Sequence, residues 1–122
     1  MTTLGGVDNE DVTNMDGSWT QSFNNSEENL VLSLDARLTQ SSEYEGDELS
    51  QIGVSIDGQI QVLNSVTGNG NGGTAIGTGF QTYRWNVNVA PGPHNLSLYC
   101  FNNKKTFANE TTSCVFDNIV FE

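Results

Sequence analysis

The chain has 122 residues, and its 15 Asp and Glu residues outnumber four Lys and Arg residues, for a formal net charge of −11. This length predicts one domain with a single hydrophobic core. The acidic excess argues against nucleic acid as a partner, because phosphate binding needs a basic face. No run approaches the roughly 18 apolar residues of a membrane span, so we expect no membrane insertion.

Residues 1–16 are acidic and contain few apolar residues, which predicts an N-terminal lead-in segment or linker. We assign the folded domain to residues 17–122. The first 14 residues show no basic region followed by an apolar one, so no signal peptide is expected. We interpret the chain as a domain cut from a larger protein, with Met1 as the start of the excised piece.

Short runs with alternating apolar residues predict β-strands throughout the domain. The clearest run places Leu30, Leu32, Leu34, Ala36 and Leu38 on one face of residues 30–39. Asp57-Gly58 predicts a tight hairpin turn. Further strands are expected at 18–23, 51–57, 60–63, 80–89, 96–101 and 114–121. The sequence therefore predicts an all-β fold, a β-sandwich (jelly roll) of about eight antiparallel strands.

The loop at residues 40–49 concentrates carboxylates between two of these strands. Within it, Glu45 and Asp47 point the same way in an extended backbone, so both can reach one cation. Oxygen ligands without His or Cys favour Ca²⁺ over zinc or copper. A solvated acidic turn is the alternative interpretation.

A second polar loop, residues 102–112, supplies amide oxygens and the carboxylate of Glu110. We expect it to meet the first loop at one end of the sandwich and to complete the calcium site. Lys104 and Lys105 are half of the chain's basic residues. They compensate nearby carboxylates or bond to a hydroxylated ligand, unless they are only solvated.

Two further features are candidates for ligand binding. Tyr44, between the acids, either stacks on a sugar ring or packs inward. Asn69 and Asn71 alternate with glycines in a stretch that has no phosphate-loop ending, and their oxygens can face a ligand. A plain flexible loop is the competing interpretation of that stretch.

A resemblance rests on several segments between residues 18 and 121. The segments are Leu38-Thr39-Gln40, Glu43-Tyr44-Glu45-Gly46-Asp47-Glu48, Val54-Ser55-Ile56-Asp57-Gly58, Gly68-Asn69-Gly70-Asn71-Gly72-Gly73-Thr74, Phe101-Asn102-Asn103-Lys104-Lys105-Thr106, Asn109-Glu110 and Phe116-Asp117-Asn118-Ile119. Together they resemble the calcium-dependent jelly-roll carbohydrate-binding modules, among them xylan binders, found in large secreted or surface proteins of bacteria.

The resemblance implies a secreted or cell-surface module that recognises a polysaccharide or other glycan through Ca²⁺ and the end loops 40–49 and 102–112. It implies a set of metal ligands, namely Glu45, Asp47, Glu48, Asn103 and Glu110, with Asp117 as a structural ligand. The sugar-binding candidates are Tyr44, Asn69, Asn71, Asn102, Lys104 and Lys105. A calcium-rigidified structural or adhesive module without sugar binding is the alternative.

The two cysteines are not part of the resembled pattern. Cys100 and Cys114 flank the second loop, so a disulfide between them would clamp its base if strands 95–101 and 113–121 were antiparallel neighbours. Two free thiols is the alternative.

Enzymatic activity is not expected. A glycosidase needs two carboxylates across a cleft, and Glu45 and Glu110 sit in short loops that leave little room for one. His94 follows a proline in a turn, and no serine or cysteine has a recognisable catalytic partner.

Overall fold

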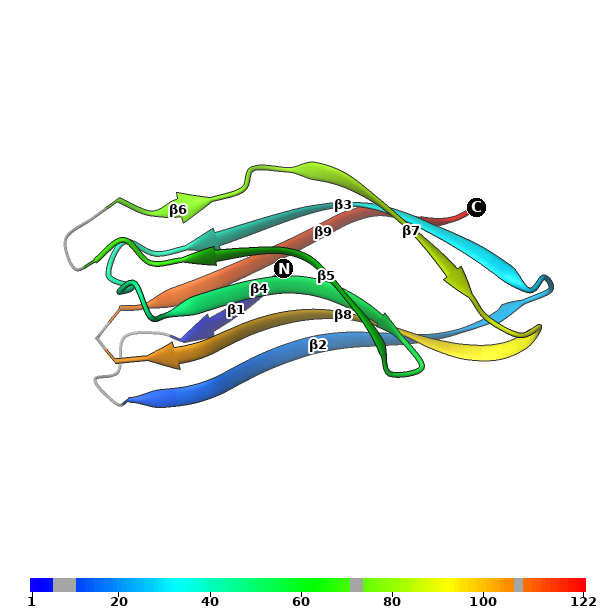
Figure 1. The fold of residues 1–122 in the computed structure, drawn as a ribbon, viewed down its shortest axis with the longest axis horizontal. Coiled ribbons are helices and arrows are strands. Elements are labelled where there is room, and N and C mark those ends of the chain that lie inside the picture. The colour runs from blue at the N-terminus through cyan, green and yellow to red at the C-terminus, as the bar shows by residue number, and fades with distance from the viewer. Residues whose placement is uncertain (6–10, 71–73, 107–108) are drawn as a thin grey trace.

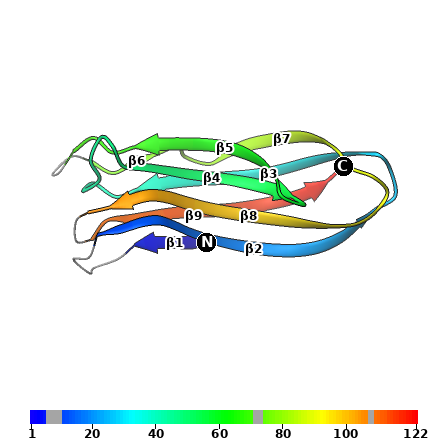
Figure 2. The same cartoon turned by 60° about the horizontal axis from the view of Figure 1, so that its bottom comes forward.

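The structure is a computed structural model, and it describes residues 1–5, 11–70, 74–106 and 109–122. Nine strands form two antiparallel sheets that pack face to face (Figures 1 and 2). The strands are β1 (Thr2–Gly5), β2 (Val12–Asn25), β3 (Asn29–Gln40), β4 (Leu49–Ile56), β5 (Gln59–Thr67), β6 (Ile76–Gly77), β7 (Gln81–Asn88), β8 (Gly92–Lys105) and β9 (Thr111–Phe121). The predicted all-β sandwich is confirmed.

One sheet has the order β1-β9-β3-β6, with β7 also paired to β3, and the other has the order β2-β8-β4-β5. The period-two pattern of β3 explains the core, because its alternate leucines are buried between the sheets. They pack with Val54 and Ile56 of β4 and with Leu96 and Leu98 of β8. Within the described residues, no helix is long and apolar enough to cross a membrane.

The turn between β4 and β5 has the conformation that its sequence predicts. Asp57 and Gly58 have φ angles of 50° and 83°, and Ile56 pairs with Gln59. Two successive positive φ angles are characteristic of the primed two-residue hairpin turn.

The N-terminal residues differ from the expected lead-in segment, because they contribute strands to both sheets. β1 pairs with Thr111–Cys114 of β9, and β2 begins at Val12. Leu4 is buried in the core, and Gly17 makes room for β1, since a Cβ there would lie 2.8 Å from Thr2 Cγ2. Few apolar residues are needed here because a single buried leucine anchors so short a strand.

Cys100 and Cys114 form a disulfide with a Cα–Cα distance of 5.7 Å. The bond forms although the condition considered in the sequence analysis, that its two strands are antiparallel neighbours in one sheet, is not met. β8 pairs with β2 and β4, whereas β9 pairs with β1 and β3, so the bond joins the two sheets across the core. Disulfides persist in oxidising environments such as the extracellular space.

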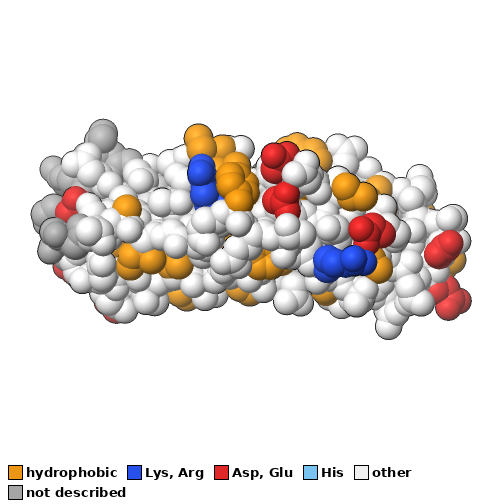
Figure 3. Space-filling model, turned by 90° about the horizontal axis from the view of Figure 1, so that it is seen from above, with side chains coloured by type: hydrophobic (Ala, Val, Ile, Leu, Met, Phe, Trp, Pro, Cys, Tyr) orange, Lys and Arg blue, Asp and Glu red, His pale blue; other side chains and the backbone are white. Residues whose placement is uncertain are grey.

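The outer surface is mixed in character. Figure 3 shows hydrophobic, basic and acidic side chains scattered over one face among uncharged polar groups. Phe80 is 51% exposed, and the guanidinium of Arg37 lies 4.9 Å from its ring centroid. This geometry is a cation–π contact that covers part of an exposed aromatic ring.

Candidate functional site

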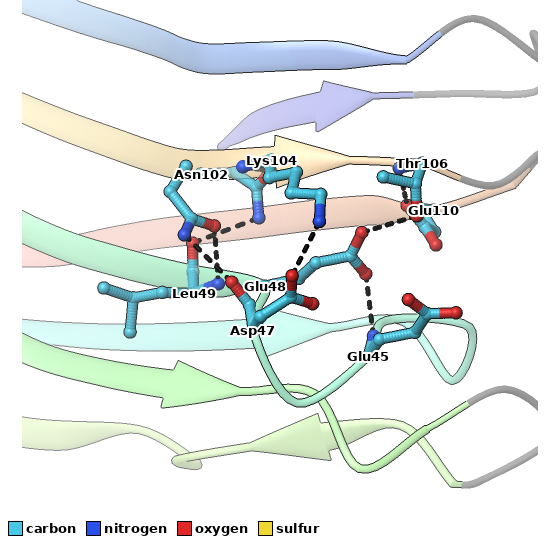
Figure 4. A network of polar contacts seen from close by, with 9 residues as sticks. Glu45, Asp47, Glu48, Leu49, Asn102, Lys104, Thr106 and Glu110 are labelled. Carbon is cyan, nitrogen blue, oxygen red and sulfur yellow. Dashed lines mark hydrogen bonds and ion pairs between the residues drawn. The ribbon is translucent and has the colours of Figure 1, made fainter.

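The two polar loops meet at one end of the sandwich, as expected. In one sheet, Gln40 at the end of β3 pairs with Thr112 near the start of β9. In the other sheet, Ser50 near the start of β4 pairs with Asn102 near the end of β8. The acidic segment 41–48 therefore emerges beside the end of β8 and the start of β9. Figure 4 shows side chains of the acidic segment and of the end of β8 pointing toward one another.

Three carboxylates converge in the first loop. Each of Glu45, Asp47 and Glu48 offers one oxygen, and these atoms all lie within 4.8 Å of one another. Glu48 is buried, Glu45 is partly exposed and Asp47 is exposed. A cation between them would be held from the interior by Glu48 and remain accessible from solvent, so this acidic triad can hold a metal ion.

The carboxylate of Glu48 is held in place from two directions. Its Oε2 accepts a 2.7 Å hydrogen bond from the backbone N–H of Glu45, and its Oε1 accepts one of 2.7 Å from the Thr106 hydroxyl. The Glu48 N–H in turn donates to the Glu45 carbonyl at 3.0 Å. These bonds close a tight turn and connect it to the end of β8, so they hold the buried carboxylate in one orientation.

Lys104 supplies positive charge beside the triad. Its Nζ lies 2.6 Å from Asp47 Oδ2, and this hydrogen bond is the main reason why the pKa of Asp47 is lowered. The same bond, with the charges of Asp47, Glu48 and Glu45, raises the pKa of Lys104. Lys104 thus compensates carboxylate charge, one of the two roles predicted for it.

Asn102 and Asn103 fix the backbone of the acidic loop. Asn103 Oδ1 accepts from the Leu49 N–H at 2.7 Å, and its Nδ2 donates to the Asp47 carbonyl at 3.1 Å. Asn102 is fully buried, donates to the Leu49 carbonyl at 3.1 Å and accepts from the Lys104 N–H at 3.0 Å. Burial removes Asn102 from any sugar-binding surface, which corrects its predicted role.

Tyr44 packs inward and is fully buried, so it does not stack on a sugar. Its hydroxyl accepts a 3.2 Å hydrogen bond from Thr112, whose Oγ1 also lies 2.6 Å from Ser50 Oγ. Burial raises the pKa of Tyr44 to about 12, and the nearby charges of Glu110 and Glu48 act in the same direction. The ring is therefore part of the interior beside Thr112 rather than of a ligand-binding surface.

The remaining predicted residues lie in three places, namely the interior, the surface and the middle of β9. Lys105 and Glu110 are fully buried, and Glu110 Oε2 accepts from the Thr106 N–H at 2.8 Å. Glu110 lies outside the group of converging carboxylates, and the buried Lys105 presents no surface to a sugar. Asn69 is exposed, and Asn71 lies outside the described residues. Asp117 pairs with Asp35 well along β3, so the structure does not bring it to the triad.

The glycine-rich stretch contributes to the site through its backbone. Gly68 and Gly70 donate to the Glu48 and Tyr44 carbonyls at 3.1 and 3.0 Å. A Cβ on Gly68 would lie 2.2 Å from the Tyr44 carbonyl group, so only glycine permits this approach.

Sequence reasoning missed several buried polar side chains that support the loop. Gln40 is fully buried, and its Nε2 donates to the Glu48 carbonyl at 3.0 Å and to Ser50 Oγ at 3.1 Å. The signal was present, since Gln40 follows Leu38 in the core-facing alternation of β3. A polar residue at such a position indicates a buried polar network rather than a simple strand end.

A second surface feature lies on the outer face of the four-stranded sheet. The Tyr99 ring lies over Gly53, where a Cβ would be 2.3 Å from the ring. The shallow depression around it has a volume of about 470 Å³. It is lined by hydroxyl, amide and apolar side chains together with one carboxylate, that of Asp16.

No protein-family model matches the chain, and no curated protein matches it. Among solved structures, the chain is similar to a chain of infectious bursal disease virus Gt strain, with a TM-score of 0.44, 12% identity, and coverage of 98% of this chain and 32% of that chain. A chain of the Gx strain gives a TM-score of 0.20 and 9% identity, with coverage of 98% and 36%. The chain thus spans about a third of these structures, and similarity this low carries no functional inference.

Proposed function

We propose that this domain is a calcium-binding β-sandwich module, in which one ion fixes the acidic loop to the end of the sandwich. The observation that carries the proposal is the convergence of carboxylate oxygens from Glu45, Asp47 and Glu48 within 4.8 Å. Calcium accepts six to eight oxygen ligands in flexible geometry, so water and backbone carbonyls complete such a site. The disulfide supports a secreted or surface location, where calcium is abundant.

Calcium competes with the lysine already present in this site. Lys104 bonds to Asp47, and the charges of Glu48 and Glu45 also stabilise its protonated form. A divalent ion neutralises three converging carboxylates better than one ammonium does, because it carries twice the charge and binds several oxygens at once. On binding, Asp47 exchanges its bond to Lys104 for a bond to the ion.

Titration calorimetry with calcium tests this function on the chelator-treated chain. We expect saturable binding and a calcium-dependent rise in melting temperature, both lost in Glu48→Gln. Glu43→Gln is the matched control, because it removes the same charge from the same loop outside the triad. Equal calcium affinity in the two variants would reject the triad as the site.

Carbohydrate binding is the second candidate function, and the Tyr99 depression supports it. Aromatic rings bind the apolar faces of sugars, while hydroxyl and amide groups bond to sugar hydroxyls. The lining contains no basic side chain, so a neutral polysaccharide is the favoured ligand. The end-loop version of this function is weaker, because Tyr44, Asn102 and Lys105 are all buried.

Affinity gel electrophoresis with neutral polysaccharides, with and without chelator, distinguishes sugar binding at the Tyr99 depression from sugar binding at the end loops. Retardation that persists in chelator but is lost in Tyr99→Ala supports the sheet face. Trp19→Ala, which removes a half-exposed aromatic outside this depression, is the control. No retardation on any glycan, together with calcium-raised melting, leaves the structural module as the function.

A further inference from the structure

One side of the sandwich, between β2 and β9, is only partly closed. β1 pairs with Thr111–Cys114 of β9 on this side. From residue 115 to 121, no strand within the described part of the chain pairs with the same edge of β9, whose other edge is paired with β3. Backbone N–H and C=O groups on an open strand edge can pair with a further strand.

Core-facing apolar side chains are exposed along this open stretch. Gly17 of β2 faces the interior, since a Cβ at this position would meet the side chains of Thr2 and Leu4 of β1. Because side chains alternate along a strand, Trp19 has the same inward orientation, yet it is 50% exposed. Ile119 on β9 is 38% exposed.

These side chains line a depression with a volume of about 390 Å³. Its walls include Trp19, Leu98, Phe116 and Ile119, and Met1 and Thr2 lie at one end. Beyond it, the rings of Phe23 and Phe121 stack with centroids 4.4 Å apart and join the two sheets directly. The depression is therefore a bounded gap in the closure of the core, between β1 and the Phe23–Phe121 stack.

We propose that this gap is an acceptor groove for an extended β-strand of another polypeptide, which adds antiparallel to β9 in line with β1. The groove is continuous with the β1–β9 interface, since Thr2 pairs with Cys114 and the same register places Met1 opposite Val115, so the first position beyond β1 is Phe116. An added strand satisfies the open backbone edge, and its alternate side chains cover Trp19 and Ile119. A small ligand offers no equivalent row of backbone groups.

Charge selects the kind of strand. The chain carries a net charge of −11, so a second copy brings like charge to the interface, whereas a strand with basic residues brings opposite charge. The expected partner strand is apolar at alternate positions, to fill the groove, and neutral or basic at the others.

A synthetic peptide tests the groove on the full chain. The probe alternates threonine and valine over seven residues between two terminal lysines, and the control peptide has proline in place of the central residues. We expect the probe to slow amide exchange in residues 115–121 about tenfold, since each acquired hydrogen bond must open before exchange. In a Trp85→Phe background it shifts the Trp19 emission to the blue, and Ile119→Lys abolishes both effects.

Fusing the same strand directly before Met1 provides a second measurement that does not depend on peptide affinity. A glycine-serine extension of equal length is the control. Protection of residues 115–121 by the strand extension alone supports the groove, whereas equal exchange in both fusions overturns it. A dimer of the unmodified chain in light scattering that Ile119→Lys converts to a monomer also overturns the proposal, because the edge then belongs to a second copy.

Discussion

Lys104 Nζ lies 2.6 Å from Asp47 Oδ2, and this ion pair links the end of β8 to the acidic loop between β3 and β4. The contact is exposed on both sides, so by itself it contributes little to stability. Its importance lies in its position beside Glu48, which is buried. The ammonium occupies the solvent side of a carboxylate cluster whose interior side is already fixed by hydrogen bonds.

Asp47→Ala is expected to lower calcium affinity at least about tenfold, because one charged ligand of the triad is lost. Titration calorimetry in low-salt buffer measures the change. Lys104→Met is the companion variant, and it is expected to raise the affinity because the competing cation is gone. Unchanged affinity in Asp47→Ala would exclude this residue from the metal site.

Removing the disulfide is expected to destabilise the domain by about 3 kcal/mol in the chain-entropy model, since the bond closes a loop with a sequence separation of 14. Urea unfolding of the Cys100→Ala, Cys114→Ala double variant measures this loss. The parent chain, reduced while unfolded and refolded with reductant present, is the control. It lacks the disulfide but keeps both cysteine side chains, so it separates loss of the bond from the effect of the alanine substitutions. A midpoint equal to that of the parent would show that packing between the sheets, rather than the cross-link, holds the loop base.

A histidine contact at the other end of the sandwich, named here the His94–Asp57 clasp, predicts that stability depends on pH. His94 Nδ1 lies 2.5 Å from Asp57 Oδ2, and its Nε2 lies 2.5 Å from the Ala90 carbonyl. Both neighbours accept hydrogen bonds, so the protonated ring, which donates from both nitrogens, is favoured. The bond to Asp57 is the main cause of the raised pKa of His94, and the pKa of Asp57 is lowered by bonds from Asn95 and His94.

The sign of each contribution follows from these directions. The stability that His94 contributes is fully present below its unfolded pKa of about 6.5 and is lost as pH rises through the higher folded value. The contribution of Asp57 is present above its unfolded pKa and is lost as pH falls through the lower folded value. Urea midpoints measured between about pH 5 and pH 9, a range that includes the ordinary pKa of histidine, should therefore fall with rising pH more in the parent than in His94→Gln. Parallel curves would contradict the clasp.

The strands were predictable from sequence because burial leaves a period-two signal in them, as in β3. The turn at Asp57-Gly58 was predictable because both residues tolerate positive φ angles. The position of the two loops followed from the same strands. The orientation of Tyr44 did not, since its loop has no periodicity to show which side chains face inward. Lys105 is the last residue of β8, where the alternation of buried residues breaks, because Lys104 is partly exposed and Lys105 is buried. The sequence predicts Lys105 as a ligand-binding residue from its place in the polar segment, and its complete burial corrects that prediction.

Gly68→Ala is expected to destabilise the acidic loop. A Cβ at Gly68 would lie 2.2 Å from the Tyr44 carbonyl oxygen and 2.5 Å from the Glu45 carbonyl oxygen, so the two backbone segments must separate. We expect a loss of about 1–3 kcal/mol in unfolding free energy, typical of overpacking at a buried contact. Calcium affinity should fall as well, because the displaced backbone carries Glu45.

Gly46→Ala is the matched control in the same region, because a Cβ at Gly46 meets no atom within 4 Å. Its unfolding free energy should stay within about 0.5 kcal/mol of the parent, as for most surface substitutions. Urea unfolding and calcium titration of the two variants side by side isolate the backbone contact from the general effect of adding a methyl group. Equal behaviour of the two variants would mean that the glycine-rich stretch does not support the carboxylate triad.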